Sequence, residues 1–146
     1  MAVRSPLINV MVNAAYKAAR GLVRDFGEVE QLQVSRKGVA DFVSTADLKA
    51  EKVLKQELGK ARPRFSFLME ESGATAAAAG GEQEPEGRWI VDPLDGTTNF
   101  LHGIPHFAIS IGLEREGAMV AGLIYNPANE EMFIAEKGKG AFMNEH

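Results

Sequence analysis

Cysteine is absent from this chain of 146 residues, and histidine occurs only at His102, His106 and His146. Without cysteine the chain has no disulfide framework, no thiolate zinc site and no cysteine nucleophile. Three scattered histidines do not make a zinc site either. Any metal must therefore be held mainly by oxygen atoms.

The chain also lacks a run of about 20 apolar residues, the length needed to cross a membrane, and its start does not follow the pattern of a secretory signal. We therefore expect a cytoplasmic protein. The net charge of −4 and the pI near 5.4 argue against direct binding of nucleic acid, because such proteins typically have a basic surface. With 45% hydrophobic and 25% charged residues, the composition is that of an ordinary globular domain.

The first half of the chain predicts two amphipathic helices. The first begins at Ser5-Pro6, because serine caps a helix and proline suits its first position. It is expected to end near Phe26, before Gly27. A short strand is then expected over residues 32–35, followed by a turn at Lys37-Gly38.

The second helix is expected to run from a cap at Ser44 or Thr45 to about Gly59. Asp47 shares the apolar face of this helix with Leu54, so its carboxylate is expected to point inward from the first turn. The alternative is an aspartate that only interacts favourably with the helix dipole. On position alone, this alternative is favoured.

Two short apolar strands, over residues 65–69 and 89–91, run directly into acids at Glu70-Glu71 and at Asp92. If the two strands are neighbours, Glu70 and Asp92 meet at one edge of the sheet. The Ala- and Gly-rich segment 74–87 between them is expected to be an exposed, mobile loop. Further strands are predicted over residues 107–113, 119–125, 132–135 and 141–143. The fold class is therefore α+β, with two N-terminal helices packed on a mostly antiparallel sheet.

The segment Asp92–Phe100 carries the chemistry. It places two carboxylates three positions apart, then Gly96 and two threonines, directly after an apolar strand. Carboxylates are ligands for Mg²⁺, and the free N–H groups that open the following short helix can bind a phosphate. The Thr97 hydroxyl can orient a water if Asp47 stands behind it as a base. Asp92 is best placed to bridge two divalent ions, an arrangement that serves phosphoryl transfer.

A purely structural turn is the alternative interpretation of this segment. In that interpretation Pro93 fixes the exit from the strand, Gly96 supplies a positive φ, and Asp95 caps the next helix. It does not account for Asp92, which has no evident local partner in the sequence. We therefore favour the metal and phosphate interpretation.

The chain resembles the inositol monophosphatase family of Mg²⁺-dependent, lithium-sensitive phosphatases. Three blocks carry the resemblance, Asp41–Asp47, Leu68–Ser72 and Trp89–Phe100, and Leu101–Phe107 with Ser110–Leu113 continue it. The resemblance implies one half of a layered αβαβα sugar-phosphatase fold. It also implies hydrolysis of inositol 1-phosphate, or a similar polyol monophosphate, by direct attack of a metal-activated water. Two or three Mg²⁺ ions per site, a homodimer, and no nucleic-acid or membrane partner are further expectations.

The metal ligands are implied by the resemblance residue by residue. Glu70, Asp92 and the backbone carbonyl of Leu94 would hold the first metal ion. Asp92 and Asp95 would hold the second. Glu71 would not bind an ion itself but would support the residues that do.

The catalytic and substrate-binding residues are implied in the same way. Asp47 and Thr97 would be the catalytic pair, with Thr97 orienting the attacking water. Asp95, Gly96, Thr97 and Thr98 would bind the substrate, with the phosphate held by the backbone of Gly96 and Thr97.

Members of the family are nearly twice as long as this chain. Residues 1–146 therefore resemble the N-terminal metal- and phosphate-binding half, and one further metal carboxylate would lie in the half that this chain does not contain. We expect an exposed apolar face where that half packs. Two alternatives stay open. The chain is either a catalytically incomplete member acting as a binding or regulatory protein, or a phosphatase for nucleotide 3′-phosphate, fructose 1,6-bisphosphate or histidinol phosphate.

Overall fold

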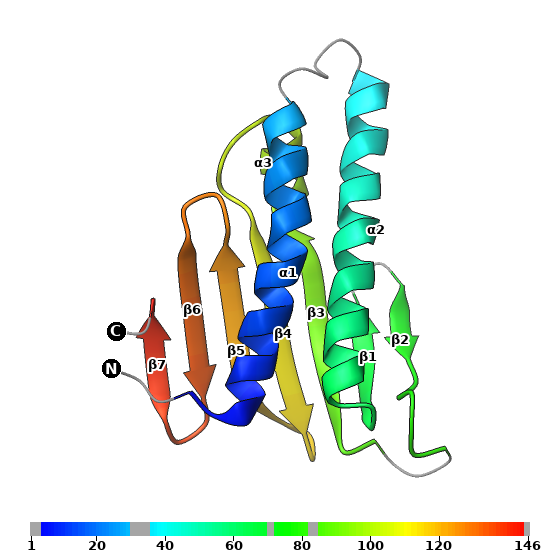
Figure 1. Cartoon of the computed structure of the whole chain (residues 1–146), viewed down its shortest axis with the longest axis vertical. Coiled ribbons are helices and arrows are strands. Elements are labelled where there is room, and N and C mark those ends of the chain that lie inside the picture. The colour runs from blue at the N-terminus through cyan, green and yellow to red at the C-terminus, as the bar shows by residue number, and fades with distance from the viewer. Residues whose placement is uncertain (1–3, 30–35, 70–71, 82–84, 145–146) are drawn as a thin grey trace.

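The computed structural model describes residues 4–29, 36–69, 72–81 and 85–144. Its elements are α1 (Pro6–Val29), α2 (Arg36–Ala61), β1 (Phe65–Met69), β2 (Gly73–Thr75), β3 (Gly87–Asp95), α3 (Thr97–Leu101), β4 (Ala108–Arg115), β5 (Ala118–Asn126), β6 (Glu131–Glu136) and β7 (Gly140–Met143). Figure 1 shows α1 and α2 side by side over one face of the sheet. The predicted α+β class is confirmed. None of the helices in the described ranges is long and apolar enough to cross a membrane.

The seven strands form one sheet in the order β2-β1-β3-β4-β5-β6-β7. Strands β3 to β7 are neighbours in sequence as well as in space, and each adjacent pair is antiparallel. The exception is β1, which pairs parallel to β3 and antiparallel to β2. The mostly antiparallel sheet and the four predicted C-terminal strands are thus confirmed.

Helix α1 begins where it was predicted. The backbone N–H of Ile8 donates to Ser5 Oγ at 3.2 Å, which is the capping bond expected of a serine before Pro6. The helix does not stop before Gly27, however, but continues to Val29. Val29 is fully buried, so its packing outweighs the weak helix propensity of one glycine.

Helix α2 begins eight positions before the predicted cap, at Arg36 rather than Ser44. The predicted turn at residues 37–38 is therefore wrong, and the strand expected over 32–35 lies outside the described residues. Thr45 does not cap the helix, because its hydroxyl donates to the Asp41 carbonyl one turn earlier, at 3.0 Å. Val39 and Val43 are both buried. They extend the apolar face upstream and keep this segment helical despite its local turn signals.

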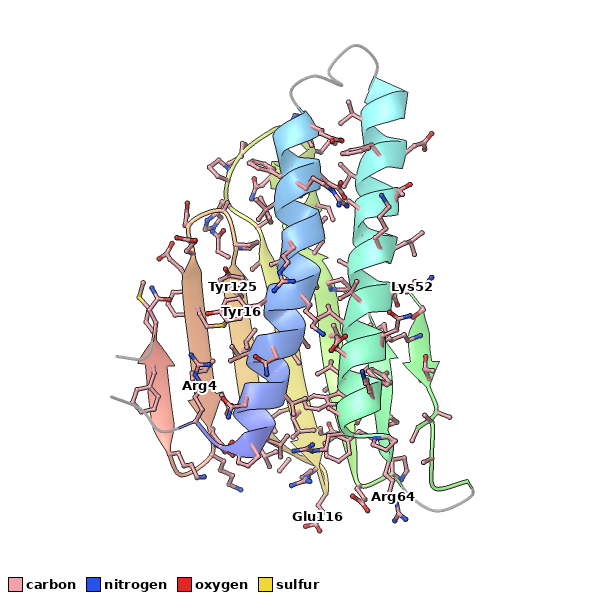
Figure 2. All side chains as sticks on the ribbon, in the orientation of Figure 1. Arg4, Tyr16, Lys52, Arg64, Glu116 and Tyr125 are labelled. Atoms are coloured by element: carbon pink, nitrogen blue, oxygen red, sulfur yellow. The ribbon has the colours of Figure 1, made fainter. Side chains whose placement is uncertain are left out.

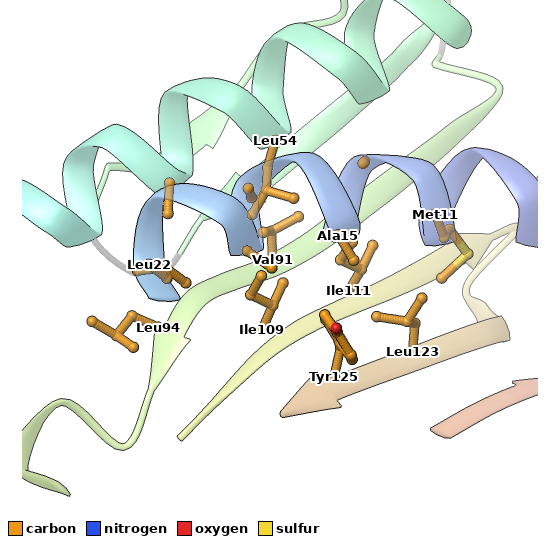
Figure 3. Packing of buried hydrophobic residues seen from close by; sticks show 14 of the residues in the cluster. Met11, Ala15, Leu22, Leu54, Val91, Leu94, Ile109, Ile111, Leu123 and Tyr125 are labelled. Atoms are coloured by element: carbon orange, nitrogen blue, oxygen red, sulfur yellow. The ribbon is translucent and has the colours of Figure 1, made fainter. Parts of the chain in front are cut away.

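The core lies between the helices and the sheet. Alternate residues of the strands point toward the helices, as the period of two requires, and Figure 3 shows them packed against the facing sides of α1 and α2. Buried residues from both layers are Met11, Ala15, Leu22, Leu54, Val91, Leu94, Ile109, Ile111 and Leu123. This layer fixes the helices relative to the strand ends, where the candidate site lies.

The other face of the sheet, the outer face, is apolar and uncovered. It carries four large exposed side chains, Met119, Ile124, Phe133 and Met143, which are 42–52% exposed. Small residues such as Gly112 and Gly122 line a hollow of about 580 Å³ between them. The exposed apolar face expected from the sequence is therefore present.

The segment between β1 and β3 was predicted as an irregular loop, and this is wrong at its start. Residues Gly73–Thr75 form β2 and pair with β1. Within the described part of the remainder, Ala79 N–H bonds to the Pro63 carbonyl at 2.7 Å, and Glu86 N–H bonds to the Arg64 carbonyl at 3.1 Å. These bonds hold the segment against the end of β1 that lies opposite the candidate site.

Candidate active site at the ends of β1 and β3

The candidate site forms where two parallel strands end side by side. Met69, the last residue of β1, lies opposite Val91 of β3. Because the two strands are parallel, both run toward the same end of the sheet, where β3 leads into α3 (Figure 1). The hypothesis that the two strands are neighbours is confirmed. Glu70 and Glu71 themselves lie outside the described residues.

Strand β3 is longer than predicted and contains both carboxylates of the motif. Asp92 lies opposite Ser110 and Asp95 opposite Ala108, with a bulge between them. Pro93 sits inside this bulge, where its missing N–H costs no ladder bond. The bulge interrupts the in-and-out alternation, so that Asp92 is half-buried while Asp95 is exposed.

The interpretation that Asp92 has no local partner is wrong. Its Oδ1 accepts a hydrogen bond from the backbone N–H of Leu94 at 3.2 Å. Such a bond from an aspartate to the backbone two residues on is typical of an Asx turn. It couples the orientation of the carboxylate to the bulge, and Leu94, which is 2% exposed, anchors the bulge in the core.

The strand register also fixes which face of the sheet Asp92 occupies. Residues directly opposite one another in an antiparallel pair lie on the same face. One row of such partners runs from β3 to β7 through Asp92, Ser110, Ile124, Phe133 and Met143. Asp92 therefore lies on the outer face, at the end of the exposed apolar row.

Gly96 makes the turn from β3 into α3, as predicted from its freedom to adopt a positive φ. Its φ is 89° and ψ is 39°, in the left-handed region, where a Cβ is unfavourable. A Cβ at this position would also come within 3.0 Å of the His106 carbonyl oxygen and 3.3 Å of Phe107 Cα. Gly96 is itself the cap of α3, without a side-chain cap bond. The role of Asp95 as the cap is therefore wrong.

Phe100 of α3 packs against two aromatic rings outside the helix, Phe26 of α1 and Phe107, and none of the three was predicted from the sequence to support the site. Phe100 lies 4.9 Å from Phe107 and 5.4 Å from Phe26, between ring centroids, and Phe26 lies 4.9 Å from Phe107. Asn99 Nδ2 adds a hydrogen bond to the His106 carbonyl at 2.8 Å. The first turn of α3 is thus tied both to α1 and to the loop that leads into β4.

The first turn of α3 presents two hydroxyls. Thr97 and Thr98 are both exposed, and the N–H groups at the start of a helix have no partner within the helix. Helix α3 packs against α2, the helix that carries Asp47. The elements that bear the two predicted catalytic residues are therefore in contact.

Asp47 points inward, as predicted, and is 7% exposed. It is not in the first turn of its helix, because α2 begins at Arg36, so a helix-dipole role does not account for it. One turn later Glu51 is also buried, at 6% exposed, and accepts a hydrogen bond from Ser72 Oγ. Glu51 was not predicted from the sequence, although its position four residues after Asp47 on an apolar face was the available signal.

The donors gathered at the strand ends are all oxygen atoms. In the described ranges, no three acidic or histidine side chains come together closely enough to form a metal site by themselves. Asp92, Asp95 and the carbonyl of Leu94 form one stretch of β3, and Glu70 follows the neighbouring strand in the sequence. Oxygen donors of this kind suit a hard cation such as Mg²⁺.

Comparison with known proteins agrees with this arrangement. The Inositol monophosphatase family profile matches residues 3–146. An "Inositol-1-monophosphatase" of Mesorhizobium japonicum is 62% identical over 142 residues, which cover 97% of this chain and 52% of the relative. A "Putative Nus factor SuhB" of Neisseria meningitidis is 38% identical over 141 residues, which cover 97% of this chain and 52% of that protein.

Solved structures give the same result. The native crystal structure of extragenic suppressor protein SuhB from Bartonella henselae superposes with a TM-score of 0.81 at 62% identity, covering 97% of this chain and 53% of that one. This chain thus spans about half the length of the curated relatives it matches. Its fold is the corresponding half of the fold of those proteins. The chain belongs to the inositol monophosphatase family.

Proposed function

We propose that this chain is the metal- and phosphate-binding half of a Mg²⁺-dependent phosphomonoesterase that hydrolyses inositol 1-phosphate or a similar polyol monophosphate. The observation that carries the proposal is the pair of adjacent strand ends. One strand leads into Glu70-Glu71, and the other ends in Asp92 and Asp95 before the left-handed Gly96. The name of the Mesorhizobium relative, at 62% identity, supports inositol 1-phosphate as the first substrate to test.

The metal ligands in this proposal are Glu70, Asp92 and the Leu94 carbonyl for one ion, with Asp92 and Asp95 for another. Glu71 supports them from behind. The described donors fit, because they are oxygen atoms at one sheet edge and Asp92 is already oriented by a backbone bond. When bound, Mg²⁺ neutralises phosphate charge and makes a water more acidic.

The remaining steps belong to the side chains and backbone of α2 and α3. The N–H groups of Gly96 and Thr97 bind phosphate oxygens, with Asp95 and Thr98 beside them. The Thr97 hydroxyl orients the attacking water, takes a proton from it and passes its own proton to the carboxylate of Asp47, which acts as the base. As the water oxygen bonds to phosphorus, the bond from phosphorus to the alcohol oxygen breaks, and that oxygen takes up a proton from solvent.

We propose that a second half of the protein covers the outer face and completes the site. Two observations support this. The curated relatives are about twice as long as the matched segment, and Asp92 lies in the same row as the uncovered apolar side chains Ile124 and Phe133. A half that packs on this face lies directly beside Asp92, where it can add ligands and contact the alcohol part of the substrate. A homodimer of the whole protein is part of the same proposal.

A binding or regulatory role is the second candidate function. It is favoured by the relative named as a putative Nus factor, at 38% identity. In this case the site would bind its ligands without turnover, and the acidic chain, at a net charge of −4, would favour a protein partner. If the protein is an enzyme, nucleotide 3′-phosphate, fructose 1,6-bisphosphate and histidinol phosphate are the alternative substrates.

The deciding experiment is release of inorganic phosphate from inositol 1-phosphate, with and without Mg²⁺. It uses this chain alone and this chain recombined with the second half of the Mesorhizobium relative. Asp92→Asn is expected to abolish release. Glu116→Gln, which removes a charge at the opposite end of the sheet (Figure 2), is expected to have no effect. If either preparation binds Mg²⁺ but neither releases phosphate, the result would favour the binding or regulatory role over the enzymatic one.

A further inference from the structure

Two buried carboxylates lie one turn apart on the face of α2 that meets the sheet. Asp47 is 7% exposed and Glu51 6% exposed, and residues four apart on a helix are neighbours. A buried carboxylate is costly unless it has hydrogen-bond donors or a nearby cation. Among the described residues, none of the ion pairs formed by lysine or arginine includes Glu51.

The hydrogen-bond partner of Glu51 is Ser72, which lies directly before β2. Ser72 Oγ donates to Glu51 Oε1 at 2.5 Å, which gives the buried carboxyl group a hydrogen-bond donor. Ser72 follows Glu70-Glu71 directly in the sequence and precedes β2. On the other side of those two acids, Met69 is fixed in the ladders of both β2 and β3. The chain is therefore fixed on either side of Glu70-Glu71.

We infer that Glu51 is a positioning residue for the Mg²⁺ site, acting through Ser72. This inference rests on the proposed function. Glu51 fixes the chain where it re-enters the sheet, at the strand end that neighbours Asp92. A metal site whose supporting residues are held in advance loses less entropy when the ion binds. Loss of such supporting hydrogen bonds typically lowers metal affinity by about 10- to 100-fold.

The competing explanation is that the Glu51–Ser72 bond only stabilises the β1–β2 turn. The two explanations differ in what the variants change. A turn-stabilising bond affects the free energy of unfolding and leaves Mg²⁺ affinity unchanged. A positioning bond lowers Mg²⁺ affinity by more than any change in stability accounts for.

The test is calorimetric titration of Mg²⁺ into the whole chain, together with thermal unfolding of the metal-free protein. Ser72→Ala removes the donor without changing any charge, and Glu51→Gln removes the charge but keeps the shape. We expect Ser72→Ala to bind Mg²⁺ about 10-fold or more weakly and also to unfold at a lower temperature, because the buried Glu51 carboxyl group loses its donor. Glu51→Gln keeps an acceptor for Ser72 but without the carboxylate, so we expect a smaller loss of affinity in the same direction. The double variant should be no weaker than the weaker single variant, because both act through one bond.

Two controls make the result specific. Ser72→Thr keeps the hydroxyl donor and should bind Mg²⁺ with nearly the affinity of the parent chain. Glu57→Gln removes a charge from the same helix, where it pairs with Lys17 at 3.1 Å, and should leave affinity unchanged. If the Glu57 variant weakens binding as much as Glu51→Gln does, and Ser72→Ala has no effect, general charge and not positioning is responsible, and the inference fails.

The proposed function and this inference fail in distinguishable ways. Parent-like Mg²⁺ binding by the Ser72→Ala and Glu51→Gln variants, with binding lost in Asp92→Asn, overturns the positioning role alone. Absence of Mg²⁺ binding by the parent chain overturns both.

Discussion

Asp92 lies directly opposite Ser110 in the ladder between β3 and β4, and this pairing places the candidate metal carboxylate on the uncovered face of the sheet. Ser110 is followed in the same row by Ile124 on β5 and Phe133 on β6. The same surface that remains apolar and exposed in this chain therefore borders the candidate active site. Under the proposed function, a second half that covers this surface also completes the site.

The first prediction concerns this face. Ile124→Glu and Phe133→Glu should each prevent association with the second half of the Mesorhizobium relative, because a carboxylate would be buried in an apolar contact. Size-exclusion chromatography of the mixed halves measures the complex. Leu48→Glu, on the outward side of α2 and 59% exposed in the parent, is the matched control and should bind normally. Equal complex formation by all three variants would show that the second half packs elsewhere.

The second prediction concerns the turn at Gly96. Gly96→Ala should destabilise the fold by about 1–2 kcal/mol for the left-handed backbone alone. The contact of a Cβ with the His106 carbonyl at 3.0 Å adds to this cost and displaces the start of α3. Mg²⁺-dependent phosphate release should therefore fall as well. Chemical denaturation and the phosphate assay measure the two effects.

Gly27→Ala is the control for this prediction and should have the opposite sign. Gly27 lies within α1, and a Cβ there has no atom within 4 Å. Replacing a helical glycine by alanine without strain stabilises by about 0.4–1 kcal/mol. If both variants destabilise equally, the special geometry of Gly96 is not the cause.

The third prediction concerns the layer between helices and sheet. Leu54 is fully buried on α2 (Figure 3), whereas Leu48 on the same helix is exposed. Leu54→Ala should lower the free energy of unfolding by about 2–5 kcal/mol because it leaves a cavity. Leu48→Ala should change it by less than about 0.5 kcal/mol. Urea denaturation followed by Trp89 fluorescence distinguishes them, and similar values for the two would contradict the assignment of the faces of α2.

The fourth prediction concerns Tyr125, whose ring lies 5.3 Å from that of Tyr16, edge to face (Figure 2). Burial raises the pKa of the Tyr125 phenol above 10.0, with smaller contributions from Tyr16 and Glu130. The folded state therefore keeps this proton at a pH where the unfolded chain loses it. Stability is unaffected below about pH 10 and falls as pH rises from there toward the folded-state pKa.

Tyr125→Phe tests this dependence, because phenylalanine keeps the ring and has no proton to lose. Urea midpoints measured from pH 8 to 11 should fall less steeply for the variant than for the parent above pH 10. Tyr16→Phe, at a residue that is 41% exposed, is the comparison variant. Parallel profiles for the parent and Tyr125→Phe would show that other groups govern alkaline unfolding.

Much of the fold could be predicted because the strands follow simple alternation. The buried face of β4, with Ile109, Ile111 and Leu113, is visible in the sequence as large residues at every second position. The start of α2 could not be predicted in the same way. Local signals at residues 37–45 favour a turn and a cap, and only the burial of Val39 and Val43 against the rest of the core outweighs them.

The candidate site could be predicted in its residue types but not in its geometry. Carboxylates followed by glycine and threonine are visible in the sequence, and so is the hypothesis of adjacent strand ends. The bulge at Pro93 and the bond from Leu94 N–H to Asp92 arise from the pairing of β3 with β4. The bond between Glu51 and Ser72 joins residues 21 positions apart, a contact that periodicity does not indicate.

The single parallel pairing in the sheet has a consequence for how the molecule assembles. Strands β3 to β7 can form as successive antiparallel pairs between neighbours in the chain. Strand β1 can pair locally with β2, but its pairing with β3 has to close the longer loop between Met69 and Gly87. Contacts that close longer loops form more slowly. Strand β2 is also at the edge of the sheet and pairs with β1 over only three residues. The amides of β1 and β2 should therefore exchange with solvent as a unit, at a lower free energy of opening than those of the central strands β4 and β5. The candidate site, which lies at the ends of β1 and β3, would then form with the last strand pairing and be lost with the first one to open.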